Sequence, residues 1–229
     1  SVVYGADALS GVINLISSTK ESGQAGVWAG ERGYKYIYAN QNIKLNDGLF
    51  SYKAHFHTDQ DYNFDKEYSG DYWGNGSHYF EPQETKSLNL RYEKDGFDTG
   101  IKYRYFSEST LTAMNGKNSL SNSFDKDANL NSELFSTFAR YKATIFNEIE
   151  ATTTLSYELT ELLKDSYFKN IYTSFEPGYK YSKSQRYALE ETLNKNYKNH
   201  NFTFGTSIEW FESTTMTDDL PMRSLSNVY

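Results

Sequence analysis

The chain has 229 residues, enough for one large domain or two small ones, and it contains no cysteine. A disulfide framework and any cysteine-based metal site or nucleophile are therefore excluded. The formal net charge of -7 argues against a general nucleic-acid binder, because neutralising phosphates requires clustered Lys and Arg. Aromatic residues make up 17% of an otherwise polar chain, a mixture typical of strands whose two faces meet different surroundings, as in membrane β-barrels.

The chain opens with a stretch rich in small residues, SVVYGADALSGVINLISS. The uncharged run 8–19 is too short for a membrane-spanning helix, which needs about 20 apolar residues. It also lacks the basic region that precedes the apolar part of a signal peptide. The glycines at positions 5 and 11 predict tight turns or close packing, and residues 12–16 have the composition of a buried strand.

Segments with strict two-residue alternation follow. In 50–60, Phe50, Tyr52, Ala54, Phe56 and Thr58 alternate with Ser51, Lys53, His55, His57 and Asp59. The same alternation is clear in 97–108, 149–160 and 201–210, and noisier in 25–32, 37–45, 85–94, 133–146 and 186–197. It predicts strands with one apolar and one polar face. The pattern is weakest in 186–197, because Glu191 and Lys195 fall on its apolar face.

The connections between these segments alternate in length. Short turn signals occur at 46–48, 95–96, 147–148 and 199–200, whereas 61–83, 109–132 and 163–184 are long and polar. Short turns at one end and long loops at the other predict an all-β fold, an antiparallel transmembrane β-barrel. A soluble β-rich carbohydrate-binding module, such as a propeller or a sandwich, is the alternative. A propeller blade needs four short strands per repeat, whereas each repeat here has two long ones.

The polar strand faces supply the first set of candidate site residues. These are Lys53, His55, His57, Asp59, Lys102, Arg104, Arg140 and Lys142. In a barrel they line the lumen as a solvated polar wall, and the cations are placed to attract an anionic ligand. The row of His55, His57 and Asp59 also has the residue types of a metal site, but a polar wall explains the same spacing, so we predict no metal site.

The second set lies in the segment 71–82, which holds Tyr72, Trp73, His78, Tyr79 and Phe80. Exposed aromatic side chains suit contact with a ring or chelate, although an interfacial girdle would have the same composition. We predict ligand contact. No nucleophile elbow, phosphate-binding loop or zinc-binding helix motif is visible, so we expect no enzymatic activity.

Residues 4–16, YGADALSGVINLI, resemble the end of the plug domain of TonB-dependent outer-membrane receptors. In that family a Tyr-Gly-x-x-Ala-x-x-Gly-Val-Ile-Asn pattern precedes the first barrel strand. The matching residues are Tyr4, Gly5, Ala8, Gly11, Val12, Ile13 and Asn14. Ser10 departs from the family, which often has a second glycine there, and the rest of the chain matches in pattern only.

The resemblance implies that residues 1–18 end a plug domain and that 19–229 form the N-terminal part of a barrel. About nine of the family's twenty-two strands would be present, so the chain would be a fragment. The implied function is import of a scarce nutrient chelate, foremost a ferric siderophore, with haem, cobalamin and oligosaccharides as other cargoes of the family. The implied partners are TonB with ExbB and ExbD, the lipid of a Gram-negative outer membrane and the chelate itself. No resident cofactor is implied.

Overall fold

The computed structural model describes residues 21–31, 33–59, 83–109, 129–146, 148–168 and 178–214. These ranges contain nine strands and no helix: β1 (Ser22–Ala29), β2 (Lys35–Leu45), β3 (Gly48–Asp59), β4 (Gln83–Lys94), β5 (Phe97–Ser109), β6 (Asn129–Ile145), β7 (Ile149–Phe168), β8 (Gly178–Tyr197) and β9 (His200–Ser213). The sequence motif at 4–16 and the predicted loop residues between 71 and 82 lie outside the described residues.

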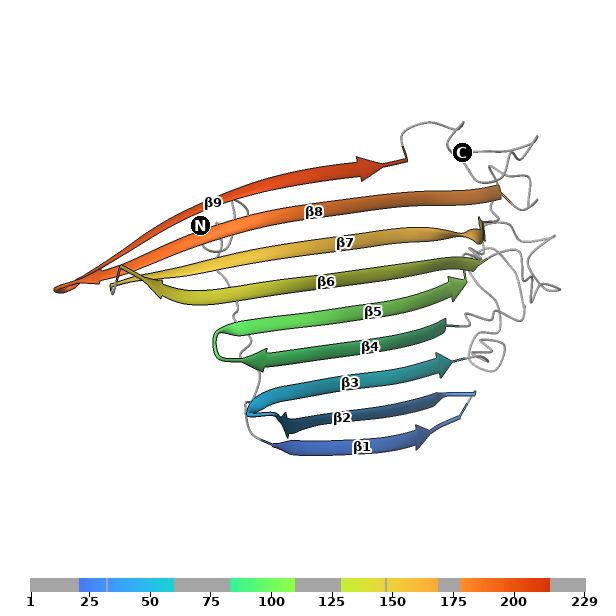
Figure 1. Ribbon diagram of the computed structural model, residues 1–229. Helices are drawn as coiled ribbons and strands as arrows, with labels where there is room; N and C mark the ends of the chain where they lie inside the picture. Colours follow the sequence, from blue (N-terminus) through green and yellow to red (C-terminus); the bar gives the residue numbers. More distant parts are fainter. Residues whose placement is uncertain are drawn as a thin grey trace, which may run out of the picture.

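The strands form one antiparallel sheet in which each strand pairs with its neighbours in sequence, in the order β1 to β9 (Figure 1). The predicted all-β, antiparallel organisation is confirmed. Within the described residues the sheet is open, with β1 and β9 as its two edges.

The short connections that follow β2, β4, β6 and β8 gather at one end of the sheet, and the connections that follow β1, β3, β5 and β7 leave from the other end (Figure 1). Asn46 and Asp47 between β2 and β3 have φ of 49° and 61°, and Asp95 and Gly96 between β4 and β5 have φ of 47° and 82°. Two successive residues with positive φ make the tight hairpin turn whose twist matches that of the flanking strands. The turn residues predicted at 46–47 and 95–96 therefore act as expected. In the β6–β7 and β8–β9 connections positive φ falls on Phe146 and Lys198, one residue before the pairs predicted there.

The predicted connection 163–184 is too long, because β7 continues to Phe168 and β8 already begins at Gly178. The strands pair in this region through Ser166 with Lys180 and Tyr167 with Tyr179, after a register shift between Leu162 and Ser166. Backbone pairing needs no apolar alternation, and a bulge interrupts the two-residue period, so the sequence pattern ends before the strands do.

A cluster of hydrogen bonds among Ser107, Asn131 and Ser166, which we call the polar knot, holds this bulge against β6. The Ser166 side chain is fully buried; its hydroxyl accepts a hydrogen bond from the Asn131 backbone N–H and donates one to the Asn131 carbonyl, both at 3.0 Å. The Asn131 side chain accepts a 2.6 Å hydrogen bond from the Ser107 hydroxyl. The knot thereby joins β5, β6 and β7.

Replacing Ser166 by Ala is expected to lower the free energy of unfolding by about 1–3 kcal/mol, because it leaves a buried N–H and a buried C=O unpaired. The measurement is the urea-unfolding midpoint of the full-length protein. Ser182→Ala is the matched control, since Ser182 is exposed on the neighbouring strand. Equal midpoints for the two variants would show that the bulge does not depend on this hydroxyl.

The register assigns every strand residue to one of two faces, because directly paired residues in an antiparallel sheet project to the same side. We call one the apolar face. Its members include Val27, Ile37, Phe50, Leu90, Ile101, Phe135, Leu155, Leu189, Ile208 and Trp210. The opposite side, the polar face, carries most of the charged side chains.

The apolar face is not covered by the described part of the chain. Within that part Ala188 is the one buried hydrophobic residue, whereas Val27 and Ile208 are each 72% exposed and Trp210 is 69% exposed. A water-soluble domain would bury such side chains in a core. The described sheet therefore has two exposed faces of opposite character and no apolar core of its own.

Candidate binding surface on the polar face

All eight predicted polar-wall residues lie on the polar face. Lys53, His55, His57 and Asp59 belong to β3, Lys102 and Arg104 to β5, and Arg140 and Lys142 to β6. The register brings them together across strands: Lys53 is opposite Asn89, which is opposite Lys102, and His55 is linked in the same way through Ser87 to Arg104. This adjacency could not be derived from the alternation alone.

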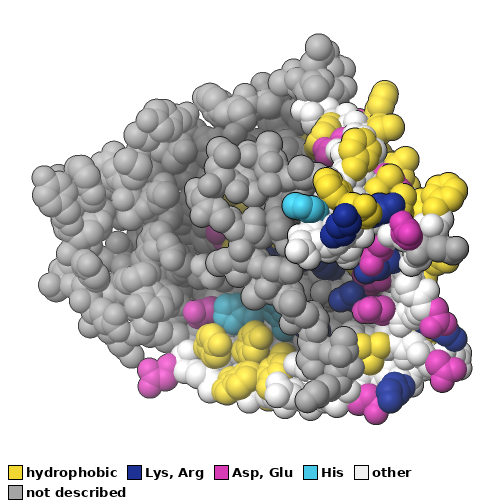
Figure 2. Space-filling view, turned by 90° about the vertical axis from the view of Figure 1, so that its left-hand side faces the viewer, with side chains coloured by type: hydrophobic (Ala, Val, Ile, Leu, Met, Phe, Trp, Pro, Cys, Tyr) yellow, Lys and Arg dark blue, Asp and Glu magenta, His cyan; other side chains and the backbone are white. Residues whose placement is uncertain are grey.

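Five rings gather on the polar face of β1 to β3, and we call them the ring cluster: Trp28, Tyr36, Tyr38, His55 and His57. Trp28 and Tyr38 are stacked, with centroids 5.1 Å apart and an interplanar angle of 12°. The centroid of the Tyr36 ring lies 5.9 Å from that of the His55 ring and 6.3 Å from that of the His57 ring. Viewed from the turn end, histidine side chains lie against a group of hydrophobic ones (Figure 2).

A glycine makes the stacking in the ring cluster possible. Gly26 is directly opposite Tyr38, and a Cβ at position 26 would overlap the Tyr38 ring. The Tyr38 ring therefore lies across the bare backbone of β1 and meets Trp28, a residue that is 51% exposed. His55 is fixed from the other side, since its Nδ1 lies 2.6 Å from the Ser87 hydroxyl. The result is an ordered aromatic surface on an otherwise polar face, suited to stacking against a planar group.

Beside the ring cluster lies a set of cations that we call the cation row: Lys53, Lys102 and Arg104. No described acidic residue forms an ion pair with any of the three. Lys53 and Lys102 are exposed, and Arg104 lies 5.6 Å from the centroid of the Phe106 ring. An uncompensated positive charge beside aromatic rings attracts anions that carry planar groups.

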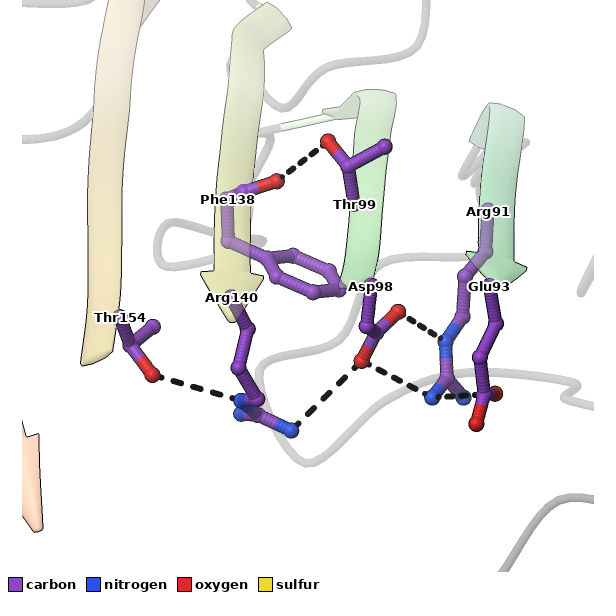
Figure 3. A network of polar contacts seen from close by, with 7 residues as sticks. All are labelled: Arg91, Glu93, Asp98, Thr99, Phe138, Arg140 and Thr154. Carbon is purple, nitrogen blue, oxygen red and sulfur yellow. Dashed lines mark hydrogen bonds and ion pairs between the residues drawn. The ribbon is translucent and has the colours of Figure 1, made fainter. Parts of the chain in front are cut away.

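The charges nearer the hairpin turns are paired instead (Figure 3). Asp98, only 7% exposed, accepts hydrogen bonds from Arg91 Nε at 2.6 Å and from Arg91 Nη2 at 3.0 Å. Arg140 approaches the same carboxylate from β6 at 3.6 Å, and its Nε donates to the Thr154 hydroxyl at 3.3 Å. The bidentate Arg91–Asp98 contact fixes both side chains in one geometry.

A second paired group is centred on Arg186 of β8. Its guanidinium lies 2.9 Å from Glu209 of β9 and 3.3 Å from Glu158 of β7. In β6 and β7, Lys142 pairs with Glu150 at 2.7 Å. Two of the predicted cations, Arg140 and Lys142, are thus neutralised by neighbours, whereas Lys53, Lys102 and Arg104 are not. The capacity to attract an anion is concentrated on β3 to β5.

Several residues of this surface were missed by sequence reasoning. Trp28, Tyr36 and Tyr38 alternate along the strands with the apolar residues at positions 27, 37 and 39. The two-residue period therefore already indicated that these three rings lie on the polar face. Their meeting with His55 and His57 depends on the register of three strands, which the sequence does not display. The predicted ligand-contact residues Tyr72, Trp73, His78, Tyr79 and Phe80 lie outside the described residues.

Among the residues that the structure describes, no group of three or more His, Asp and Glu side chains is arranged to hold a metal ion. The same residues contain no helix that is long and apolar enough to cross a membrane. Comparisons of the chain with protein-family models, with curated proteins and with solved structures found no match. The inference of function therefore rests on the sequence and on the two faces of the sheet.

Proposed function

We propose that the chain is part of a TonB-dependent receptor of a Gram-negative outer membrane, which imports a scarce nutrient chelate such as a ferric siderophore. In this proposal the sheet is the N-terminal part of a transmembrane β-barrel, preceded by the end of a plug. TonB, with ExbB and ExbD, supplies the energy. The observation that carries the proposal is the exposed apolar face opposite a charged one, which is the alternation of barrel strands between lipid and lumen.

The charges on the apolar face support this orientation. Most of them, Lys35, Glu84, Lys86, Glu133, Glu161, Lys183 and Glu212, lie toward the ends of their strands that are remote from the hairpin turns after β2, β4, β6 and β8. The others are bonded: Lys94 donates to the Asn46 carbonyl at 2.7 Å, Glu191 accepts from the Thr153 hydroxyl at 2.6 Å, and Lys195 pairs with Glu148 at 2.8 Å. Charges that are paired, hydrogen-bonded or peripheral are what a lipid-facing surface tolerates.

Aromatic side chains mark the turn end of the apolar face. Phe146 in the β6–β7 turn is 86% exposed, and Tyr141, Tyr197 and Phe202 are also exposed close to the turns. Aromatic residues concentrate where a membrane protein passes from hydrocarbon to headgroups. These residues fit the girdle on the side of the short turns.

The hairpins are also progressively staggered, as Figure 1 shows. β6 continues past the β4–β5 turn by residues 142–145, and β8 continues past the start of β7 by residues 196–197. A stagger that accumulates in one direction is the shear that lets tilted strands close into a barrel. β7 and β8 have 20 residues each, twice the roughly 10 that cross a bilayer, so their far ends project beyond it.

In this proposal capture needs no covalent chemistry. The predicted loop aromatics make the first contact with the chelate, and the cation row beside the ring cluster attracts an anionic one into the lumen. The side chains that are already paired, such as Asp98 with Arg91, hold the wall in shape. Recognition and wall stability are thus assigned to different residues.

Single cysteines test which face meets lipid, because this chain contributes no cysteine of its own. Ile101→Cys and Lys102→Cys are adjacent residues on opposite faces and form a matched pair. In the complete protein, inserted into vesicles, a fluorophore at 101 is expected to be quenched by lipids that carry a nitroxide on the acyl chain, and one at 102 by a water-soluble quencher.

Leu155→Cys and Ser156→Cys repeat the comparison two strands away. Equal access of the water-soluble quencher to all four positions, together with a monodisperse protein in water, would contradict the receptor proposal. It would favour the alternative, a soluble carbohydrate-binding module.

A further inference from the structure

Cations and rings without carboxylates cover part of the polar face of β2 to β5, and we call this area the wall patch. It consists of three successive rows of directly paired residues: Tyr36, His57, Thr85 and Phe106; Tyr38, His55, Ser87 and Arg104; and Asn40, Lys53, Asn89 and Lys102. The flanking residues of β1 and β6 in these rows carry no acidic side chain either: Trp28, Gly26 and Gln24, and Ser132, Leu134 and Ser136. The wall patch covers roughly 13 by 14 Å, enough for a large planar ligand.

The charges of the wall patch give it a direction. The cation row lies in its second and third rows, on the side nearer the hairpin turns. The nearest carboxylates of β3 and β5, those of Asp59 and Glu108, lie in the next row beyond His57, on the opposite side. A ligand that carries its negative charge at one edge is therefore favoured with that edge toward Lys53 and Lys102.

An oriented imidazole lies at the centre of the wall patch. His55 is directly opposite Tyr38 on one side and is linked through Ser87 to Arg104 on the other. Its Nδ1 lies 2.6 Å from the Ser87 hydroxyl, and no described residue forms a hydrogen bond with its Nε2. With the Nδ1 hydrogen donated to the Ser87 oxygen, Nε2 keeps its lone pair. A hydrogen bond to the other ring nitrogen is how proteins orient a histidine that ligates a metal.

One imidazole cannot hold a free metal ion, but it suffices for a metal that arrives in a chelate with an open position. A planar macrocycle supplies four ligands in its plane and leaves axial positions for a histidine. A siderophore that fills every coordination position of its iron leaves none, so it gives the oriented nitrogen nothing to bind. The stacked rings of Trp28 and Tyr38 beside His55 also suit a flat aromatic ligand better than a flexible saturated one.

We infer that the wall patch binds a planar metal macrocycle with carboxylate side groups, of the haem class, with His55 Nε2 as an axial ligand. The Nε2 lone pair forms a coordinate bond with the metal in place of a water molecule, and no oxidation or reduction is needed. The macrocycle packs beside Trp28 and Tyr38, and its carboxylates lie at the cation row. The inference rests on the proposed function, in which this face lines the lumen, and it names the class of chelate.

Absorption titrations of the complete protein in mild detergent test the axial ligand, with ferric protoporphyrin IX and metal-free protoporphyrin IX as probes. The wild-type protein is expected to give the iron form the Soret shift of imidazole ligation. His55→Ala is expected to lose this shift and to bind the iron form about tenfold more weakly. Its affinity for the metal-free form is expected to stay unchanged, which also shows that the variant folds. His200→Ala, on β9 outside the wall patch, is the control and is expected to keep the shift.

The same titrations test the cations. Arg104→Gln is expected to weaken binding of both porphyrins about fivefold, because both carry the same carboxylates. Lys142→Gln is the matched control on the same face, since Lys142 is already paired with Glu150 at 2.7 Å, and it is expected to have no effect.

An unchanged Soret shift in His55→Ala, or its loss in His57→Ala instead, would overturn the inference, as would equal binding by Arg104→Gln and Lys142→Gln. The quenching of a label at position 101 separates this result from failure of the proposed function. If that label is quenched by lipid and the porphyrin results are negative, the receptor proposal stands and the macrocycle site is wrong. If the label is not quenched by lipid, the polar face does not line a lumen and both proposals are wrong.

Discussion

Replacing Ile101 by Arg is expected to lower the free energy of unfolding by about 2–4 kcal/mol, the cost of a cation at the middle of a lipid-facing barrel surface. Ile101 lies in a row of the apolar face with Leu90 and Thr137, and it is 41% exposed. In water the same substitution at an exposed position would change stability by less than about 0.5 kcal/mol. The size of the effect therefore reports what surrounds the face.

The measurement is the urea-unfolding midpoint of the complete protein in vesicles, accompanied by its abundance in the outer membrane. Lys102→Ala is the control, because Lys102 is the next residue, exposed on the polar face, without an ion pair to a described carboxylate. A near-neutral Ile101→Arg would contradict the lipid-facing assignment. A large loss in both variants would indicate that β5 is sensitive to any substitution and would not support the assignment.

Replacing Asp98 by Ala is expected to lower the free energy of unfolding by about 1.5–3 kcal/mol, the range for hydrogen bonds to charged groups. The substitution removes the carboxylate that Arg140 approaches and leaves Arg91 with Glu93 alone, at 3.1 Å. The Asp98 side chain is 9% exposed, but those of Arg91 and Arg140 are 36% and 49% exposed, so solvent screening keeps the loss below that of a fully buried pair.

A double-mutant cycle with Arg91→Ala and Asp98→Ala isolates the interaction energy of this pair. We expect a coupling energy of about 1.5 kcal/mol. Glu158→Ala is the matched control. It removes a carboxylate from the Arg186 group, where Glu158 is exposed and Glu209 remains as a partner, so its cost is expected to be about 0.5 kcal/mol. Additive effects of the two single substitutions would show that the Arg91–Asp98 contact does not stabilise the wall.

Much of the fold was predictable because it depends on local chemistry. Alternation in 50–60 and 97–108 corresponds to β3 and β5 almost residue for residue. Asn46 and Asp47 form the tight turn that their residue types favour. The far ends of β7 and β8 were not predictable, because beyond the bulge at Leu162–Ser166 the strands are held by backbone pairing and by the buried Ser166 hydroxyl instead of by an apolar pattern.

The candidate binding surface was predictable only in part, and for a related reason. His55 and His57 are assigned to the polar face by parity alone, but the contact of His55 with Ser87 joins residues 32 positions apart. The stacking of Trp28 on the Tyr38 ring and the ion pair of Arg140 with Asp98 likewise join residues from different strands. Each of these contacts depends on which residue of the next strand is directly opposite.

By itself, the sequence determined which side of the sheet each strand residue occupies, because side chains on a strand alternate with a period of two. Only the tertiary structure decided which residues meet on that side, because the pairing register brings together residues from separate strands. It decided that Lys53 and Lys102 face each other across Asn89 without a carboxylate, while Arg91 and Arg140 share Asp98. A shift of one residue in that register would have moved every one of these side chains to the opposite face.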